Sequence, residues 1–136
     1  MVDAGDTDKV QIVLAGASLT CADSAAIYSK SADKVFLTLA EGTENTLTNG
    51  GSYTAIDKNN IDSVVFSKTD LTLNGSGSLT IDAQAGHGVV SKDELTITGG
   101  SYTVTAAEHG MTGKDSLAVA GGDFTIISGK DGLHAE

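Results

Sequence analysis

Four lysines hold the same place in four copies of one short motif, which reads 'IYSKSAD' from Ile27, 'VFSKTD' from Val65, 'VVSKDE' from Val89 and 'MTGKDS' from Met111. They make up half of the eight basic residues and are Lys30, Lys68, Lys92 and Lys114. A row of ammonium groups suits the carboxylates of an acidic polysaccharide, because charge-assisted hydrogen bonds are strong. The alternative is a solvated row in which the acid after each lysine offsets the repulsion between lysines, and exposed pairs of this kind contribute little stability.

Carboxylates follow the lysines and recur at the end of the chain. The candidate calcium ligands among them are Asp70, Asp93, Glu94, Asp115 and Asp131. Calcium takes six to eight oxygen ligands, so carboxylates at the corners of a repeat, completed by loop carbonyls, suit it. The sequence contains no EF-hand loop and no 'GGxGxD' array. A generally acidic surface is therefore the alternative interpretation.

Two histidines and several aromatic residues complete the candidates. His87 and His109 occupy equivalent places in successive copies and are interpreted as polar corner residues, because a transition-metal site would need a third ligand that the sequence does not supply. Tyr28 and Phe66 each follow an apolar residue expected to point inward, so both are predicted to point outward, where a ring can stack on a sugar. Tyr53 is a third such candidate.

The spacing of the copies predicts the elements that position these residues. From Val65 the motif recurs after 24, 22 and 22 residues, and its last, degenerate copy is 'LHAE' from Leu133. A period in this range is typical of solenoids. Within each copy, apolar residues alternate with polar ones, as in strands with one buried face, and glycine-rich corners separate them. We predict an all-β, right-handed parallel β-helix of about five coils, with three short strands per coil. A β-sandwich would instead need hairpins between sequence neighbours.

Two sets of apolar residues are predicted to line the interior. One inward position is assigned to Ile12, Leu37, Leu73, Ile97 and Val119, and the next face to Leu19, Leu47, Leu79, Tyr102 and Phe124. Tyr102 and Phe124 are expected to form a core stack. The interval between Leu37 and Leu73 exceeds one coil, and the surplus is predicted to be a loop excursion at residues 49–63 from a single domain of residues 1–136.

Composition limits the partners. The net charge of −10, with every basic residue a lysine, argues against nucleic acid or anionic lipid as a ligand. No run of 18 apolar residues is present, so no membrane insertion is expected. The chain has 17 glycines and no proline, and its one cysteine, Cys21, is predicted to be a buried apolar residue.

The chain resembles a bacterial family of carbohydrate-binding parallel β-helices whose members bind polygalacturonate and cellulose at the cell surface. The resemblance extends from about Val10 to the end and rests on 'KVFLTLAEGTENTLTNGGSY', 'VVFSKTDLTLNGSGSLTI', 'HGVVSKDELTITGGSYTV' and 'HGMTGKDSLAVAGGDFTI'. It implies a fold similar to that of pectate lyases, an association with calcium and an extracellular or cell-surface location, although the chain shows no signal peptide. It also implies a partial domain. The family usually has Asp before the corner glycine, where this chain has His87, His109 and Asp131.

Four functions are thus in view. The first is non-catalytic binding of pectin-like or cellulosic polysaccharide. A second is a calcium-dependent lyase, in which a lysine of the row with a lowered pKa would remove a proton from a uronic acid. A third is self-assembly, in which solenoid ends with unpaired strand edges stack into filaments. The fourth is an ice-binding surface of threonine columns, although threonine is also simply common in strands.

Overall fold

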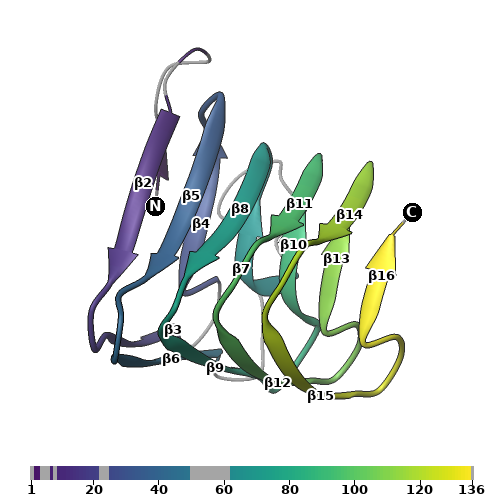
Figure 1. Cartoon of the computed structure of the whole chain (residues 1–136). Helices are drawn as coiled ribbons and strands as arrows, with labels where there is room; N and C mark the ends of the chain where they lie inside the picture. Colours follow the sequence, from purple (N-terminus) through teal and green to yellow (C-terminus); the bar gives the residue numbers. More distant parts are fainter. Residues whose placement is uncertain (1, 4–6, 8, 22–24, 50–61, 136) are drawn as a thin grey trace.

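The chain forms a solenoid of parallel strands in a computed structural model, shown in Figure 1. The structure describes residues 2–3, 7, 9–21, 25–49 and 62–135. Over these ranges all regular elements are strands, and every strand pairs in parallel with its equivalent in the next coil. The predicted β-solenoid of about five turns is therefore confirmed. No helix in the described part of the chain is long and apolar enough to cross a membrane.

Three sheets run along the solenoid. Sheet A has six strands, in the order β1 (Val2–Asp3), β4 (Ile27–Ser31), β7 (Ser63–Ser67), β10 (His87–Ser91), β13 (Met111–Gly113) and β16 (Leu133–Ala135). Sheet B has five, namely β2 (Lys9–Leu14), β5 (Lys34–Leu39), β8 (Asp70–Gly75), β11 (Glu94–Ile97) and β14 (Ser116–Val119). Sheet C also has five, namely β3 (Ser18–Cys21), β6 (Glu44–Asn49), β9 (Ser78–Ala83), β12 (Ser101–Ala106) and β15 (Asp123–Ser128).

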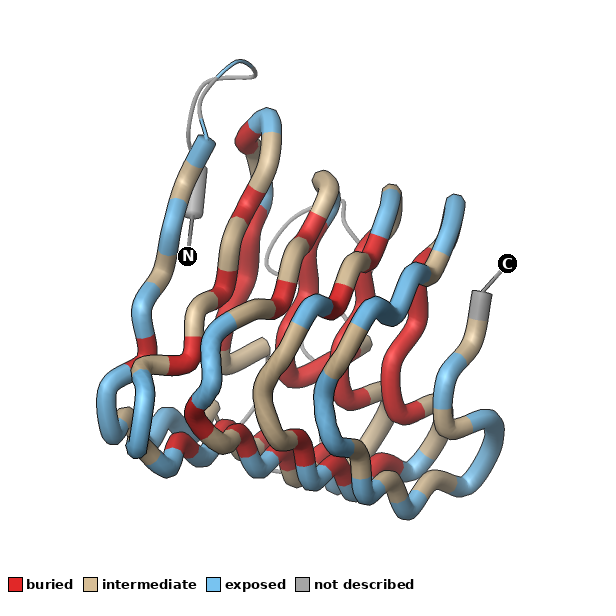
Figure 2. Tube along the Cα trace, in the orientation of Figure 1, coloured by how far each residue is buried: buried red, intermediate tan, exposed pale blue. Residues whose placement is uncertain are grey.

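The core is a stack of inward side chains enclosed by the three sheets. The predicted column of Ile12, Leu37, Leu73, Ile97 and Val119 is confirmed by the strand register on sheet B. Figure 2 shows that burial concentrates in the central coils, where Leu73 and Ile97 are almost inaccessible. Val119, in the last strand of sheet B, is 45% exposed because no described strand covers its outer side.

The column predicted on sheet C contains one error of register. Leu47 and Leu79 are predicted to share the same position, but they are offset by two residues. Leu47 pairs with Ile81, and Leu79 pairs instead with Asn45. The pattern of apolar residues does not reveal this register, because the residue that pairs with Leu79 is a buried asparagine rather than a leucine. The stack of Tyr102 on Phe124 is confirmed, with ring centroids 5.3 Å apart and 13° between the planes.

Asn45 is buried because its amide bonds to three successive coils. Its Oδ1 accepts hydrogen bonds from the backbone N–H groups of Gly16 and Ala17, at 2.9 and 2.8 Å. Its Nδ2 donates to the hydroxyl of Thr43 at 3.2 Å and to the carbonyl of Ser78 at 3.1 Å. The side chain thus satisfies backbone groups at a corner where the strand ladder cannot.

Replacing Asn45 with alanine is expected to lower the free energy of unfolding by about 2 to 3 kcal/mol, because partly buried backbone N–H groups lose their acceptor. Chemical denaturation measures the loss. The matched control is Asn74→Ala, since Asn74 accepts a hydrogen bond from Thr38 on the outer face of sheet B. That variant should lose less than about 1 kcal/mol. Equal losses in the two variants would contradict a special role for Asn45.

The predicted excursion at 49–63 overlaps strands at both of its ends, since Asn49 ends β6 and Ser63 begins β7. Its residues 50–61, Tyr53 among them, lie outside the described part of the chain.

Candidate functional site

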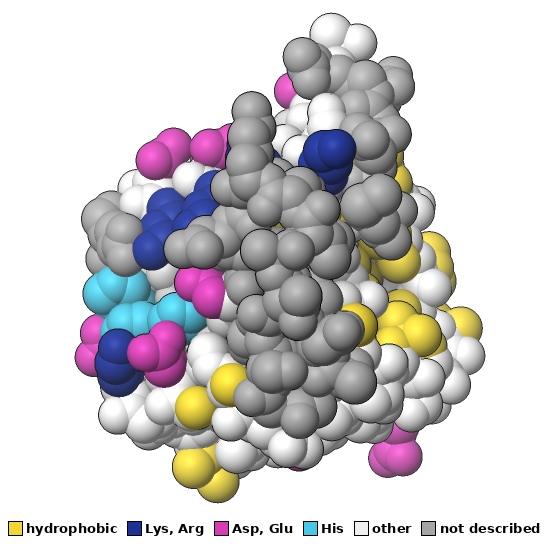
Figure 3. Space-filling model, turned by 180° about the vertical axis from the view of Figure 1, so that it is seen from behind, with side chains coloured by type: hydrophobic (Ala, Val, Ile, Leu, Met, Phe, Trp, Pro, Cys, Tyr) yellow, Lys and Arg dark blue, Asp and Glu magenta, His cyan; other side chains and the backbone are white. Residues whose placement is uncertain are grey.

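The lysine row is a regular feature of sheet A. The backbone N–H groups of Lys68, Lys92 and Lys114 each donate to the serine carbonyl that precedes the lysine of the previous coil, at 3.0, 2.8 and 2.9 Å. The lysine backbones therefore stand one strand spacing apart, about 4.8 Å. Figure 3 shows lysines near histidines and carboxylates on this side of the molecule. Lys30 and Lys68 are exposed, and the other two are half-buried.

Three of the four lysines, namely Lys30, Lys68 and Lys92, form no close ion pair with the described carboxylates. The Nζ of Lys92 instead lies 5.4 Å from the centroid of the Phe66 ring, a cation–π contact. Lys68 still interacts with Asp93 over a longer distance, so the acids beside the row offset part of its charge.

A row of carboxylates runs beside the lysines. Asp70 Oδ1 accepts a hydrogen bond from the N–H of Glu94 at 3.2 Å, and the N–H of Asp115 donates to the Asp93 carbonyl at 3.0 Å. Partial burial raises the pKa of Asp93, and the carboxylates of Asp70 and Asp115 raise it further, with Lys68 opposing them. Among the described residues, no three of these four carboxylates bring their oxygens close enough together to hold a metal ion.

Replacing Asp93 with asparagine should raise the melting temperature at pH 7 slightly, by about 1 to 2 °C. Since folding raises the pKa of Asp93 above 3.8, its ionised form costs stability, and this cost appears as the pH rises through the folded pKa. Calorimetry at pH 7 and pH 3 tests this, because the gain should vanish at the lower pH. Asp123→Asn removes the same charge from an exposed position and should have no effect. A less stable Asp93→Asn protein at pH 7 would contradict the prediction.

The prediction that Tyr28 and Phe66 present their rings to solvent is wrong. Both point away from the main core, but they are 3% and 1% exposed and form a second buried cluster with Val90. Their ring centroids are 5.8 Å apart, with 59° between the planes. Three successive strands place these apolar side chains in register on the outer face of sheet A, where they pack against one another and against Ala25. Neither ring offers a face to a sugar.

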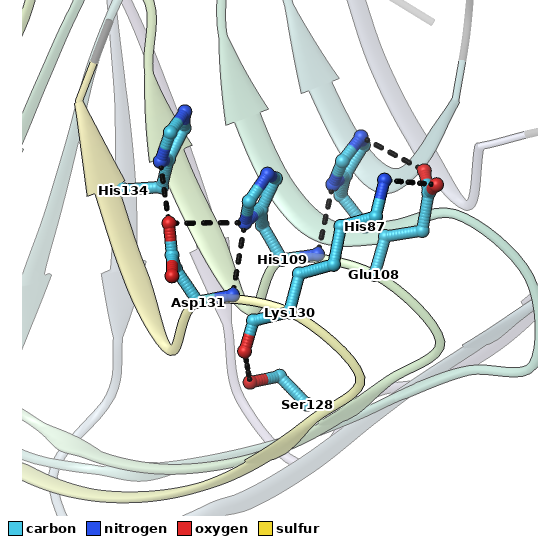
Figure 4. Close-up of polar contacts among 7 residues, drawn as sticks. All are labelled: His87, Glu108, His109, Ser128, Lys130, Asp131 and His134. Atoms are coloured by element: carbon cyan, nitrogen blue, oxygen red, sulfur yellow. Dashed lines mark hydrogen bonds and ion pairs between the residues drawn. The ribbon is translucent and has the colours of Figure 1, made fainter.

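Three histidines stack along the corner that leads into sheet A (Figure 4). The rings of His87 and His109 are 5.2 Å apart with 5° between their planes, and those of His109 and His134 are 4.0 Å apart with 6°. The first two rings are also tied to the next coil. His87 Nδ1 accepts the backbone N–H of His109, and His109 Nδ1 accepts that of Asp131, both at 3.1 Å. We name His87, His109 and His134 the histidine ladder.

Carboxylates flank the ladder. His87 Nε2 lies 3.3 Å from Glu108 Oε2 and 3.6 Å from Asp62 Oδ2. Burial nevertheless lowers the pKa of His87, and these two carboxylates oppose the shift only in part. A hydrogen bond from Lys130, at 2.8 Å, holds the pKa of Glu108 below its usual value. At neutral pH His87 is therefore an uncharged ring that accepts a hydrogen bond at Nδ1 and faces carboxylates with Nε2.

His87 and His109 are predicted from the sequence as equivalent corner residues, whereas His134, Glu108 and Lys130 are not. A signal for the last two existed, because they occupy equivalent positions in successive 22-residue copies and so had to stack. His134 belongs to the degenerate last copy, where it pairs in register with Thr112. Asp131 lies on the histidine ladder and apart from the other predicted calcium ligands, with Oδ2 2.9 Å from His134 Nδ1.

The three parallel sheets define a β-solenoid, and its surface carries columns of lysines, carboxylates and histidines that repeat from coil to coil. Residues 1–136 match the family model described as carbohydrate-binding domain-containing protein, and the chain belongs to this family. A protein of the same description from Acetivibrio thermocellus is 39% identical over 108 residues, which are 78% of this chain and 38% of that protein. The structure of a polysaccharide lyase-like protein from C. thermocellum, a gadolinium derivative, superposes with a TM-score of 0.96 at 38% identity. The match covers 99% of this chain and 55% of that one, so the chain spans little more than half the length of its structural relative.

Proposed function

We propose that this carbohydrate-binding solenoid binds an acidic, pectin-like polysaccharide such as polygalacturonate, without catalysis, along the lysine row. The observation that carries the proposal is the regular spacing of the lysines, together with the exposure of Lys30 and Lys68 to solvent. A polyuronate presents one carboxylate per sugar, so a row of ammonium groups contacts several sugars of one chain. Each charge-assisted hydrogen bond strengthens the binding.

Calcium supports the same contact. The protein carries a net charge of −10, which repels a polyanion at a distance. The carboxylates of Asp70, Asp93, Glu94 and Asp115 lie in a row beside the lysines, and the pKa of Asp93 is raised first by burial and then by the carboxylates of Asp70 and Asp115. A calcium ion between one of these carboxylates and a uronate would relieve both repulsions, with water completing its six to eight ligands.

An acidic polysaccharide is favoured over cellulose by the aromatic residues. A neutral glucan offers no charge, and its recognition would depend on exposed rings that stack on sugars. Tyr28 and Phe66 are buried, so among the described residues the predicted aromatic platform does not exist.

Affinity electrophoresis tests the proposal. The unmodified protein is run through gels that contain polygalacturonate, methyl-esterified pectin or soluble cellulose derivatives, each with calcium or with a chelator. We expect strong retardation by polygalacturonate with calcium, weaker retardation with the chelator, and none by the esterified polymer. No retardation by polygalacturonate would refute the function, and equal retardation by the esterified or cellulosic polymers would refute the charge-based mechanism.

Lyase activity is the second candidate, favoured by the description of the structural relative as polysaccharide lyase-like. Elimination across a uronic acid linkage creates an unsaturated product that absorbs ultraviolet light. Concentrated protein incubated with polygalacturonate and calcium should give a flat absorbance trace if the proposed binding function is correct. A rise in absorbance that grows with protein concentration would show catalysis.

We also propose an extracellular or cell-surface location, because a pectin-like ligand lies outside bacterial cells. End-to-end stacking stays a prediction, which light scattering at high protein concentration can test.

A further inference from the structure

His109, Asp131 and His134 bring three metal-ligating side chains together at one corner. Asp131 Oδ2 lies 2.9 Å from His134 Nδ1 and 3.8 Å from His109 Nδ1, and one ligand atom from each residue lies within 4.8 Å of the others. Figure 4 shows the two contacts meeting at the same carboxylate oxygen. We propose that these three residues form a binding site for a divalent transition-metal ion, with zinc as the best-suited ion.

The donor types decide the class of metal. Two imidazole nitrogens and one carboxylate oxygen are ligands that zinc and its neighbours prefer, whereas calcium and magnesium prefer oxygen alone. Neighbouring ligand atoms around a tetrahedral zinc ion are about 3.3 Å apart, given metal–ligand distances of about 2.0 to 2.1 Å. The observed separations lie on both sides of that value, and the rings of His109 and His134 are stacked in parallel. Closing the site therefore requires one ring to turn out of the stack and the ligand atoms to move by up to about 1.5 Å. Three protein ligands leave the fourth position to water.

The protonation of the corner also suits a metal. His109 Nδ1 accepts the N–H of Asp131, so this nitrogen carries a lone pair rather than a proton. A metal would take over that lone pair at the cost of one hydrogen bond. At His134, the metal ion would replace the proton of the hydrogen bond between Nδ1 and Asp131 Oδ2. Binding therefore competes with protons and weakens as the pH falls.

The surrounding residues hold the ligands in place. His109 is stacked between His87 and His134, which limits the rotation of its ring. The ammonium group of Lys130 is turned toward Glu108, 2.8 Å away, so its charge is directed at a carboxylate other than Asp131. Such outer contacts tune metal sites, and their loss commonly costs 10- to 100-fold in affinity.

The test uses untagged protein, freed of metal by a chelator, in a Cys21→Ser background that removes the thiol as a competing ligand. Zinc chloride is titrated calorimetrically at pH 7.5, and cobalt chloride is followed by its visible absorption. We expect one ion per chain and tetrahedral cobalt bands. Asp131→Asn and His134→Phe, which keep side-chain size and ring stacking, should each weaken zinc binding at least about tenfold. Asp123→Asn, an exposed control in the same coil, should bind like the parent.

Absence of saturable zinc binding by the parent protein would overturn the proposal, as would equal affinity in the parent and both site variants. If a variant fails to fold, nuclear magnetic resonance on the parent decides. Zinc should shift the imidazole signals of His109 and His134 first, and shifts confined to other residues would contradict the site. No polysaccharide is present in any of these measurements, so their result is independent of the proposed carbohydrate function.

Discussion

Replacing Gly75 with alanine is expected to destabilise the protein by about 3 to 5 kcal/mol, a loss close to the limit for a single substitution. Gly75 ends β8 with a φ of 99°, a conformation that a side chain disfavours by about 1 to 3 kcal/mol. A Cβ atom would also collide with the carbonyl of Leu39 in the previous coil and lie 2.7 Å from the Leu39 nitrogen. The collision involves backbone, which cannot move without breaking the ladder, and adds a further 1 to 3 kcal/mol.

Gly42→Ala is the matched control. Gly42 has a φ of 72°, but a Cβ there meets no atom within 4 Å. This variant should lose only about 1 kcal/mol, the cost of the backbone conformation. Chemical denaturation of both variants separates the free-energy cost of the backbone conformation from the cost of the collision. Equal losses would show that the close approach of successive coils at Gly75 does not limit stability.

Replacing Lys68, Lys92 and Lys114 together with alanine should weaken binding to polygalacturonate at least about tenfold, because each of several charge-assisted contacts is lost. The variant also raises the negative charge of the protein, and the slower association should be sensitive to salt. Binding is measured by affinity electrophoresis at two salt concentrations in the presence of calcium. The thermal melt of the variant shows whether the fold is intact.

A second triple variant controls for net charge. Lys9, Lys34 and Lys130 lie outside the row, and their replacement with alanine changes the charge by the same amount. This protein should retain most of its binding. Equal losses in the two variants would mean that overall charge alone drives binding, and undiminished binding by the first variant would remove the lysine row from the site.

The solenoid could be predicted from the sequence because each coil must bury the same face. Leu73 and Ile97 recur one coil apart and pair in register, as predicted. The prediction of register was wrong at Asn45, where a polar side chain is buried to satisfy backbone groups, and hydrophobic pattern carries no information on such bonds. The burial of Tyr28 also escaped prediction, because strand alternation gives the direction of a side chain but not what covers it.

The lysine row and the proposed metal site also differ in how far the sequence predicts them. The row that contains Lys68 and Lys92 was predictable, since a residue repeated at the coil period must form a column. The convergence of Asp131 and His134 on His109 depends on the path of the last corner, where the two new ligands are only three residues apart in the chain. A periodic alignment places Asp131 in the column of His87 and His109, but it does not show that His134, which pairs in register with Thr112, contacts that column.

The most direct test of the binding face is to map oligogalacturonate onto the protein by nuclear magnetic resonance, with ¹⁵N-labelled chain and calcium in the buffer. Amide signals of residues 67–69, 91–93 and 113–115 should shift together and saturate at a common ligand concentration. Residues on the outer face of sheet C, such as Thr80, Thr103 and Thr125, should not move. Shifts confined to that outer face, or spread evenly over the surface, would contradict the assignment of the lysine row as the polysaccharide-binding site.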